Sequence, residues 1–240
     1  MMILDLIGSI LITVSASIAI STLAIQFGAS QLARFRIVAG LALWFVFVVV
    51  LAATSVLHDR LVLGVPGLGL TIFLPMVVLA VTTLRSPILH QRLESVPLGI
   101  LISVNTIRVF GALFVVLYTV NRLPALFALV AGWGDVIVGL TAIPVAWLVH
   151  KKDAAAYLTA LVWNTLGILD LIAAIGLGVT SSPGPLQVFF SEPTASMMTT
   201  LPWLLIPAFL VPLLASSHLA VFYRLRRDGS YSGVRQGVSG

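Results

Sequence analysis

The sequence contains no cysteine and very few charged residues. Without cysteine the chain forms no disulfide, binds no metal or iron–sulfur cluster through thiolates and has no thiolate nucleophile, and its redox compartment stays open. Charged residues make up only 9% of the chain, whereas soluble domains carry about 25%. So little charge cannot cover a solvent-facing surface, and the composition therefore predicts an integral membrane protein.

Lysine and histidine are scarce as well. The only lysines are Lys151 and Lys152, in a predicted turn, and this excludes a retinal Schiff base inside the bundle. Among the histidines only His218 falls within a predicted span, near its inner end, so a haem held between His150 and His218 is disfavoured. No HExxH, GxSxG or P-loop pattern occurs. We expect no cofactor, no metal and no catalytic residue set.

The net charge of +5 and the pI of about 10.2 raise the question of nucleic-acid binding. No stretch interleaves basic and aromatic residues on a polar face, so we exclude nucleic acid as a partner. In a membrane protein an excess of basic residues is typical of cytoplasmic loops. The predicted partner is the lipid bilayer, and the sequence names no protein partner.

Long apolar stretches dominate the sequence. In total, 60% of the residues are hydrophobic, and the mean hydropathy is +1.14. A membrane-spanning helix needs about 20 mostly apolar residues. The pattern predicts an all-α bundle of seven spans, at residues 3–26, 37–57, 61–84, 98–120, 125–149, 154–179 and 202–223. Residues 1–223 would form one transmembrane domain, followed by a short basic tail, 224–240, disordered beyond Asp228.

The first apolar stretch has two interpretations. Asp5 is its only charged residue, and no lysine or arginine precedes it. Because a signal peptide has a basic leading region, the sequence favours a retained helix. Small residues from Ser15 to Ser17 keep cleavage open as the minor alternative.

Two connections are expected to have structure of their own. Residues 85–97 are amphipathic, with Ile88 and Leu89 on the apolar side, and predict a short interfacial segment. Residues 180–201 form the one long connection. They contain Phe189, Phe190 and a pair of methionines, which is too apolar for a free loop, so we expect this segment to fold back on the bundle.

Basic residues are distributed unequally between the two ends of the predicted bundle. Only Arg60 and Arg122 lie at one end. Ten lie at the other: Arg34, Arg36, Arg85, Arg92, Lys151, Lys152, Arg224, Arg226, Arg227 and Arg235. The positive-inside rule then predicts an outer N-terminus and a cytoplasmic C-terminus. The expected location is the bacterial cytoplasmic (inner) membrane, or another membrane with the tail in the cytoplasm.

Three charged residues lie deep within consecutive predicted spans: Arg108, Asp135 and Asp170. Counted from the outer ends at 1.5 Å per residue, they lie roughly 13 to 18 Å deep. The hydrocarbon core is about 30 Å thick, so all three fall in one layer. Short turns join the spans and make them neighbours. The sequence therefore predicts that the three side chains meet.

A charge at the bilayer centre costs about 2.5–3.5 kcal/mol on insertion scales. Pairing Arg108 with one or both carboxylates lowers this cost. The site would still hold one positive and two negative charges, so either one carboxylate is protonated or a cation joins them.

Residues around the triplet predict a packed polar centre. Asn105 shares a helix face with Arg108. Gly132 and Gly139 leave room for a neighbouring helix beside Asp135, and Gly167 lies three residues before Asp170. The candidate ligand- or ion-binding residues are Arg108, Asp135, Asp170, Asn105, Asn164, Trp133 and Trp163.

Two segments around the acids, 132–137 and 167–172, share the pattern Gly-x-x-Asp-apolar-Ile. Inverted repeats place sites in this way in many transporters, but six residues are too few, and chance is the favoured explanation.

Three functions remain open. The first is a small transporter or ligand-binding protein. In it the acids bind a proton or cation, Arg108 anchors an anionic group or acts as counter-ion, and residues 180–201 form an outer lid. The second is a sensor or assembly factor whose triplet is purely structural. The third, ranked last, is an intramembrane enzyme that uses the carboxylates as acid and base.

Overall fold

The computed structural model describes residues 2–57, 64–151 and 155–237, and no strand occurs among them. Within these ranges seven helices are long and apolar enough to span a membrane, which confirms the predicted all-α class and is consistent with a membrane-embedded chain. The connection between the second and third predicted spans, which the sequence predicts to be a tight polar turn at residues 58–60, lies outside the described residues, as do the first residues of the third and sixth predicted spans.

Five of the seven spans each consist of one regular α-helix. They are α1 (Met2–Phe27), α2 (Gln31–Ala53), α3 (Gly64–Arg85), α7 (Ala125–His150) and α8 (Ala156–Thr180). Their bounds lie within a few residues of the predicted ones except for α2, which begins six residues before Ile37. Ser30 caps this helix by accepting a hydrogen bond from the backbone of Ala33, so the helix starts at its cap rather than at the first apolar residue.

The fourth span is composite. It consists of α5 (Leu98–Ser103), a 3₁₀ segment η1 (Val104–Gly111) and α6 (Ala112–Thr119). A 3₁₀ run of more than three or four residues is uncommon, and inside a helix it often marks a hinge or strain. Arg108 lies within this segment.

The seventh span is irregular where it begins. A turn over 201–204 precedes a π-helical segment, η3 (Ile206–Leu210), and then α9 (Val211–Gly237). The predicted start at residue 202 is wrong by about one turn, because Pro202 and Pro207 have no N–H for the helical ladder. At its other end α9 continues to Gly237, where the sequence predicted a disordered tail. No proline after Pro212 interrupts it.

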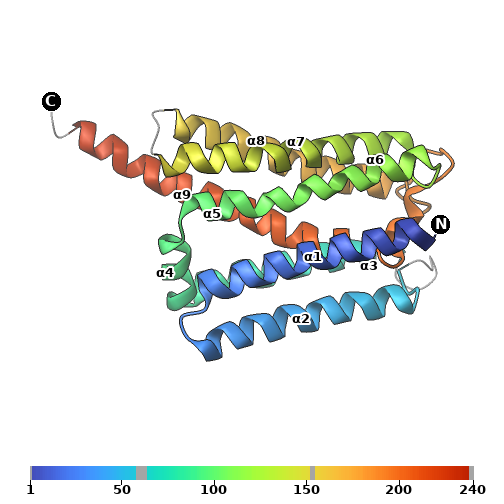
Figure 1. Cartoon of the computed structure of the whole chain (residues 1–240), viewed down its shortest axis with the longest axis horizontal. Helices are drawn as coiled ribbons and strands as arrows, with labels where there is room; N and C mark the ends of the chain where they lie inside the picture. The colour runs from blue at the N-terminus through green and yellow to red at the C-terminus, as the bar shows by residue number, and fades with distance from the viewer. Residues whose placement is uncertain (1, 58–63, 152–154, 238–240) are drawn as a thin grey trace.

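The spans fall into two groups (Figure 1). Helices α1, α2 and α3 form one side of the molecule, and the segments from α5 to α8 form the other. Helix α9 packs against α3, α5 and α8, so the last span lies between the two groups. The N-terminus lies at the same end as the α6–α7 turn and the 180–205 segment, and the C-terminus lies at the opposite end, with α4.

The two connections follow the predictions in part. Residues 85–97 contain a short helix, α4 (Pro87–Ser95), with Ile88 exposed and Leu93 buried. The 180–201 segment folds back as predicted, because its 3₁₀ turn η2 (Ala195–Thr199) buries Met198 in the core. Phe190 does not take part in this packing, since it is 82% exposed.

A polar clasp at the N-terminal end ties α1 to the second group. Asp5 Oδ1 accepts a hydrogen bond from Trp203 Nε1 at 3.0 Å and pairs with Arg122 Nη1 at 2.8 Å. The Trp203 ring is fully buried against Gly8, where an added Cβ would lie 2.7 Å from the ring. These contacts join the first helix, the α6–α7 turn and the start of the seventh span.

Candidate functional site

Arg108 is the centre of a buried polar cluster, and its side chain is only 1% exposed. Its Nε donates to Asp135 Oδ1 at 2.6 Å, and its Nη2 donates to Asp170 Oδ2. The carboxylates are 15% and 12% exposed. The predicted meeting of the three charges is therefore confirmed, with one guanidinium held between acids of α7 and α8.

The remaining nitrogen of the guanidinium is occupied too. Arg108 Nη1 donates to the backbone carbonyl of Gly167 at 3.1 Å and contacts His218 Nε2 at 3.1 Å. Four of the five N–H groups of an arginine are thus directed at partners from α7, α8 and α9. The fifth lies on Nη2, next to Asp170.

His218 extends the cluster into α9. Its Nδ1 lies 2.8 Å from Asn164 Oδ1, and Asn164 Nδ2 donates to the His218 backbone carbonyl at 3.0 Å. The carbonyl is an acceptor only, so the Asn164 amide must present its oxygen to the ring, and Nδ1 must carry the proton. The other ring nitrogen, Nε2, then accepts from Arg108, which has no acceptor atom of its own. This hydrogen-bond pattern is satisfied only by neutral His218.

Asn105 and Trp163 support the cluster through other hydrogen-bond partners. Asn105 is fully buried and donates to Ser217 Oγ at 3.1 Å, which joins η1 to α9. Trp163 donates to Thr141 Oγ1 at 3.1 Å, and its ring centroid lies 5.3 Å from that of His218. Both residues position the spans around the cluster.

Glycines allow the helices to approach closely here. An added Cβ on Gly134 would collide with the Asp170 carboxylate, and one on Gly167 would collide with the His218 ring. At Gly139, an added Cβ would lie 2.6 Å from the Val109 backbone nitrogen. The predicted role of Gly132 and Gly139 as close-packing positions is confirmed, since an added Cβ on Gly132 would lie 2.8 Å from the Val115 side chain. The roles of Gly134 and Gly167 were not predicted.

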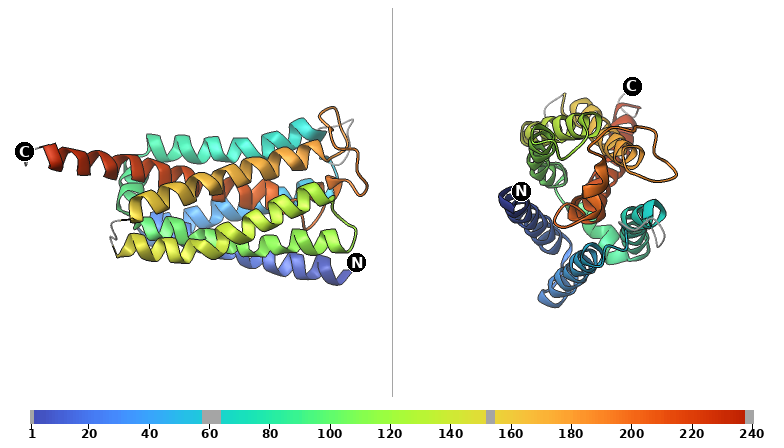
Figure 2. Two further views of the ribbon diagram at one scale, coloured as in Figure 1. Left: turned by 90° about the horizontal axis from the view of Figure 1, so that it is seen from above. Right: turned by 90° about the vertical axis from the view of Figure 1, so that its right-hand side faces the viewer.

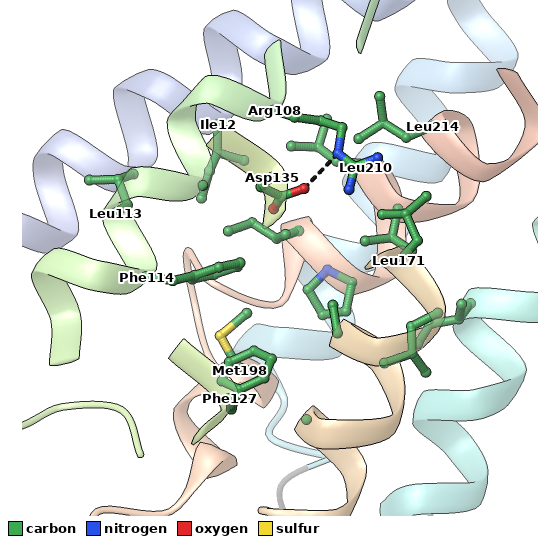
Figure 3. A pocket seen from close by; sticks show the side chains of 18 of the residues that line it. Ile12, Arg108, Leu113, Phe114, Phe127, Asp135, Leu171, Met198, Leu210 and Leu214 are labelled. Carbon is green, nitrogen blue, oxygen red and sulfur yellow. Dashed lines mark hydrogen bonds and ion pairs between the residues drawn. The ribbon is translucent and has the colours of Figure 1, made fainter. Parts of the chain in front are cut away.

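A cavity of about 90 Å³ begins at the cluster and extends toward the 180–201 segment. Its wall includes Arg108 and Asp135, but not Asp170. Figure 3 shows Arg108 and Asp135 together at one end, and Phe127 with Met198 at the other. A cavity needs a volume of about 10–15 Å³ to hold one water, so several waters or one small molecule would fit.

Both groups of helices form the cavity wall. Ile12 and Ser15 come from α1, and Leu68 and Ile72 come from α3. The other lining residues come from the second group, the 180–201 segment and the seventh span. The irregular segments η1 and η3 both line it, through Phe110 and Pro207 among others. The cavity therefore lies where the two groups meet, beside the least regular backbone of the spans.

Of the seven predicted site residues, six belong to or support the cluster, and Trp133 does not. Its side chain is 54% exposed on the outer face of α7. Trp133 lies two positions before Asp135, and residues two apart do not share a helix face. The helical spacing alone therefore argues against including Trp133 in the site.

His218 was the residue that the sequence analysis missed. It was judged to lie near the inner end of its span, but the apolar helix continues to Arg227, which places His218 within it. A histidine that deep in a span signals function by default. Among the described residues, no group of three histidine or acidic side chains is arranged to hold a metal ion.

The chain belongs to a family described as a domain of unknown function, DUF8737, whose model matches residues 65–226. The match covers more than half of the chain and includes Arg108, Asp135, Asp170 and His218, whereas α1 and α2 precede it. Neither the curated proteins nor the solved structures contain a match to this chain.

Proposed function

We propose that the chain is a small membrane transporter that binds its ligand in the cavity and carries an exchangeable proton or cation on the Asp135–Asp170 pair. The observation that supports this most directly is the double role of Asp135. Its carboxylate is paired with the buried guanidinium and also forms part of the cavity wall. A ligand in the cavity would thus alter the charge balance of the cluster.

The charge balance supports an exchangeable occupant. Two carboxylates share one guanidinium, and the hydrogen bonds of His218 fit only the neutral ring, so the ionised cluster would carry a net charge of −1. An unbalanced charge in a membrane interior is costly. One proton on the coupled acids, or one cation beside them, would remove the imbalance.

The geometry also bears on whether Arg108 anchors an anionic ligand or acts as the counter-ion of the two acids. Four of its five N–H groups are directed at protein partners. An anionic ligand would have to displace those partners. Arg108 is therefore the counter-ion of the two acids in this proposal, and not the anchor of an anion.

Backbone irregularity next to the cavity fits a moving element. The 3₁₀ segment η1 carries Arg108, and the π segment η3 lies at the start of the seventh span. Both types of segment recur at hinges and functional sites. In the proposed mechanism, rearrangement of these segments opens the cavity at alternate ends.

The sidedness is part of the proposal. By the positive-inside rule, the end with α4 and the C-terminus faces the cytoplasm of a bacterial inner membrane, and the 180–201 segment faces outward. Met198 and Ser182 from this segment line the cavity, which is consistent with a lid.

The absence of cysteine allows a direct test. Ser15 lines the cavity, and Ser17 is exposed on the same helix. Each serine donates to the carbonyl four residues before it, so Ser15→Cys and Ser17→Cys are matched variants. Each would be treated with a membrane-impermeant thiol reagent in right-side-out and inside-out vesicles.

A transporter predicts that Ser15→Cys reacts from both sides of the membrane and Ser17→Cys from neither, because Ser17 faces lipid. Reaction of Ser15→Cys from one side only would overturn transport in favour of a one-sided binding protein. No reaction from either side would overturn it in favour of a closed structural core.

One observation favours a second function, that of a sensor or assembly factor. The guanidinium of Arg108 is almost completely satisfied by protein groups, as a purely structural network requires. The labelling experiment separates the two, because a structural network has no reason to open the cavity to both sides.

A further inference from the structure

We infer that the cavity accepts a small organic monocation, namely an ammonium group attached to a compact apolar body, and that its binding releases the proton held by the Asp135–Asp170 pair. This inference rests on the proposed function, because it names the ligand class of the same cavity. It is carried by the donor and acceptor pattern of the cavity wall.

The polar groups on the wall other than Arg108 present acceptor atoms. Ser15 Oγ donates its hydrogen to the Leu11 carbonyl at 2.8 Å, and Ser182 Oγ donates its hydrogen to the Gly178 carbonyl at 2.7 Å. Thr199 Oγ1, also on the wall, donates its hydrogen to the Ser196 carbonyl at 2.7 Å. A hydroxyl has one hydrogen to donate and two lone pairs. All three hydroxyls can therefore present only oxygen lone pairs to the cavity, as does the ionised carboxylate of Asp135.

The donors of Arg108 do not reverse this pattern. Its Nε is held by Asp135, its Nη1 by Gly167 and His218, and its Nη2 by Asp170. A ligand with acceptor groups would find at most one free N–H on this wall. A ligand with several N–H donors and a positive charge would find one carboxylate and the hydroxyl oxygens of Ser15, Ser182 and Thr199.

The rest of the wall is apolar and aromatic. Phe114 and Phe127 both line it, with ring centroids 5.5 Å apart. Aromatic faces attract ammonium groups, most strongly where water is excluded. Aliphatic side chains such as Ile72 and Leu171 complete the wall and would contact the apolar body. A volume of about 90 Å³ restricts this body to a small one.

The exchange balances in atoms and charge. Before binding, the acid pair holds one proton, and the cluster is neutral. When the ammonium group enters, the O–H bond of the protonated acid breaks and the proton leaves for solvent. The carboxylate of Asp135 then forms an ion pair with the ammonium group, with no oxidation or reduction. One cation enters for each proton released, and this stoichiometry is that of an exchanger.

Three probes with one apolar body test the class on the wild-type chain: isobutylammonium, isobutanol and isobutyrate. Titration calorimetry of the full chain in detergent would measure the dissociation constant of each. We expect the ammonium ion to bind at least about tenfold more tightly than the alcohol, because the ion pair adds at least about one decade of affinity, and we expect no binding of isobutyrate. Equal binding of the alcohol would overturn the cation site. Tighter binding of isobutyrate would show that Arg108 anchors anions.

Proton release is measured in the same experiment, by repeating the titration in buffers of different ionisation enthalpy. We expect about one proton released per ammonium ion, with affinity rising about tenfold per pH unit while the acid pair is protonated. Binding without proton release would overturn the exchange step.

Two Asp→Asn variants, each of which removes one negative charge, test where the ammonium ion binds. Asp135→Asn should weaken isobutylammonium binding at least about tenfold, because it removes the carboxylate on the cavity wall. Asp5→Asn, at the clasp outside this wall, should leave it unchanged. Equal weakening in both variants would place the effect in the overall charge of the protein. If Asp135→Asn fails to fold, the three-probe comparison still decides the ligand class.

The transport function and the ligand class can be rejected independently of each other. A Ser15→Cys variant that reacts from both sides, in a chain that binds no ammonium ion, would preserve transport and reject the ligand class. Ammonium binding with reaction from one side only would preserve the ligand class and reject transport.

Discussion

The two acids of the cluster should be replaceable one at a time but not together. Asp135→Asn leaves Arg108 with Asp170, and Asp170→Asn leaves it with Asp135. In either case one positive and one negative charge remain, and the amide oxygen of the introduced side chain can still accept from the guanidinium. The charge count therefore predicts that each single substitution changes the free energy of unfolding by only about 1 kcal/mol, the difference between a charge-assisted and a neutral hydrogen bond.

The double substitution removes both counter-ions. Arg108, whose side chain is 1% exposed, would then keep only neutral partners, namely the two introduced amides, Gly167 and His218. Removing the partner of a buried charge costs about 3–5 kcal/mol. The double variant should therefore be destabilised by about 1–3 kcal/mol beyond the sum of the singles, which exceeds the usual deviation from additivity of about 0.3–0.5 kcal/mol.

The assay is a double-mutant cycle on the purified chain in detergent, with unfolding followed by loss of helical circular dichroism. Asp5→Asn combined with Asp135→Asn serves as a control cycle. Asp5 pairs with Arg122 in the separate clasp, so this control should be additive. If the Asp135 and Asp170 effects simply add, or if one single variant costs as much as the double, the shared-guanidinium reasoning is refuted.

Three further predictions concern packing, the histidine and sidedness. Gly134→Ala should destabilise the chain by at least about 1 kcal/mol, because its Cβ would displace a carboxylate of the cluster, whereas Gly176→Ala, with open space around its Cβ, should stabilise it by up to about 1 kcal/mol in the same unfolding assay. Truncation of the fully buried His218 to alanine should cost at least about 2 kcal/mol, since it removes hydrogen bonds to two neighbouring spans and leaves a cavity. In right-side-out vesicles an impermeant thiol reagent should label Ser191→Cys but not Ser95→Cys, since these exposed serines lie in the loop and in α4, at opposite ends of the bundle.

Each of these has a clear contrary result. Equal effects of the two glycine substitutions would mean that close approach at Gly134 is unimportant. A neutral histidine truncation would remove His218 from the cluster. Labelling of Ser95→Cys and protection of Ser191→Cys would reverse the predicted orientation.

The membrane spans and the charged triplet were predictable because their signals are local. An apolar stretch of about 20 residues identifies a span in isolation, and counting residues from its end gives the depth of a charge. Arg108, Asp135 and Asp170 were placed in one layer by this count alone. Their pairing then followed from the cost of leaving any of them single.

The rest of the site depends on tertiary contacts, which leave little trace in the sequence. The 3₁₀ segment over 104–111 contains no proline, and its one glycine, Gly111, is its last residue, so its conformation reflects the surrounding helices. The cavity depends on α1, which is distant in sequence from the cluster. His218 was missed because the seventh span was predicted to end at residue 223, whereas the apolar helix continues to Arg227. The predicted end placed His218 too close to the membrane surface.

The 3₁₀ conformation of η1 also sets the length and rotation of the fourth span. A 3₁₀ helix advances about 2.0 Å per residue and an α-helix about 1.5 Å. Rewinding the eight residues of η1 as α-helix would shorten this span by about 4 Å and rotate its two ends relative to each other by about 160°. Arg108 lies inside the segment and is held by three other helices, so its ion pairs oppose that rotation. A change in the charge of the cluster would then be converted into a screw-like displacement of one span along the membrane normal.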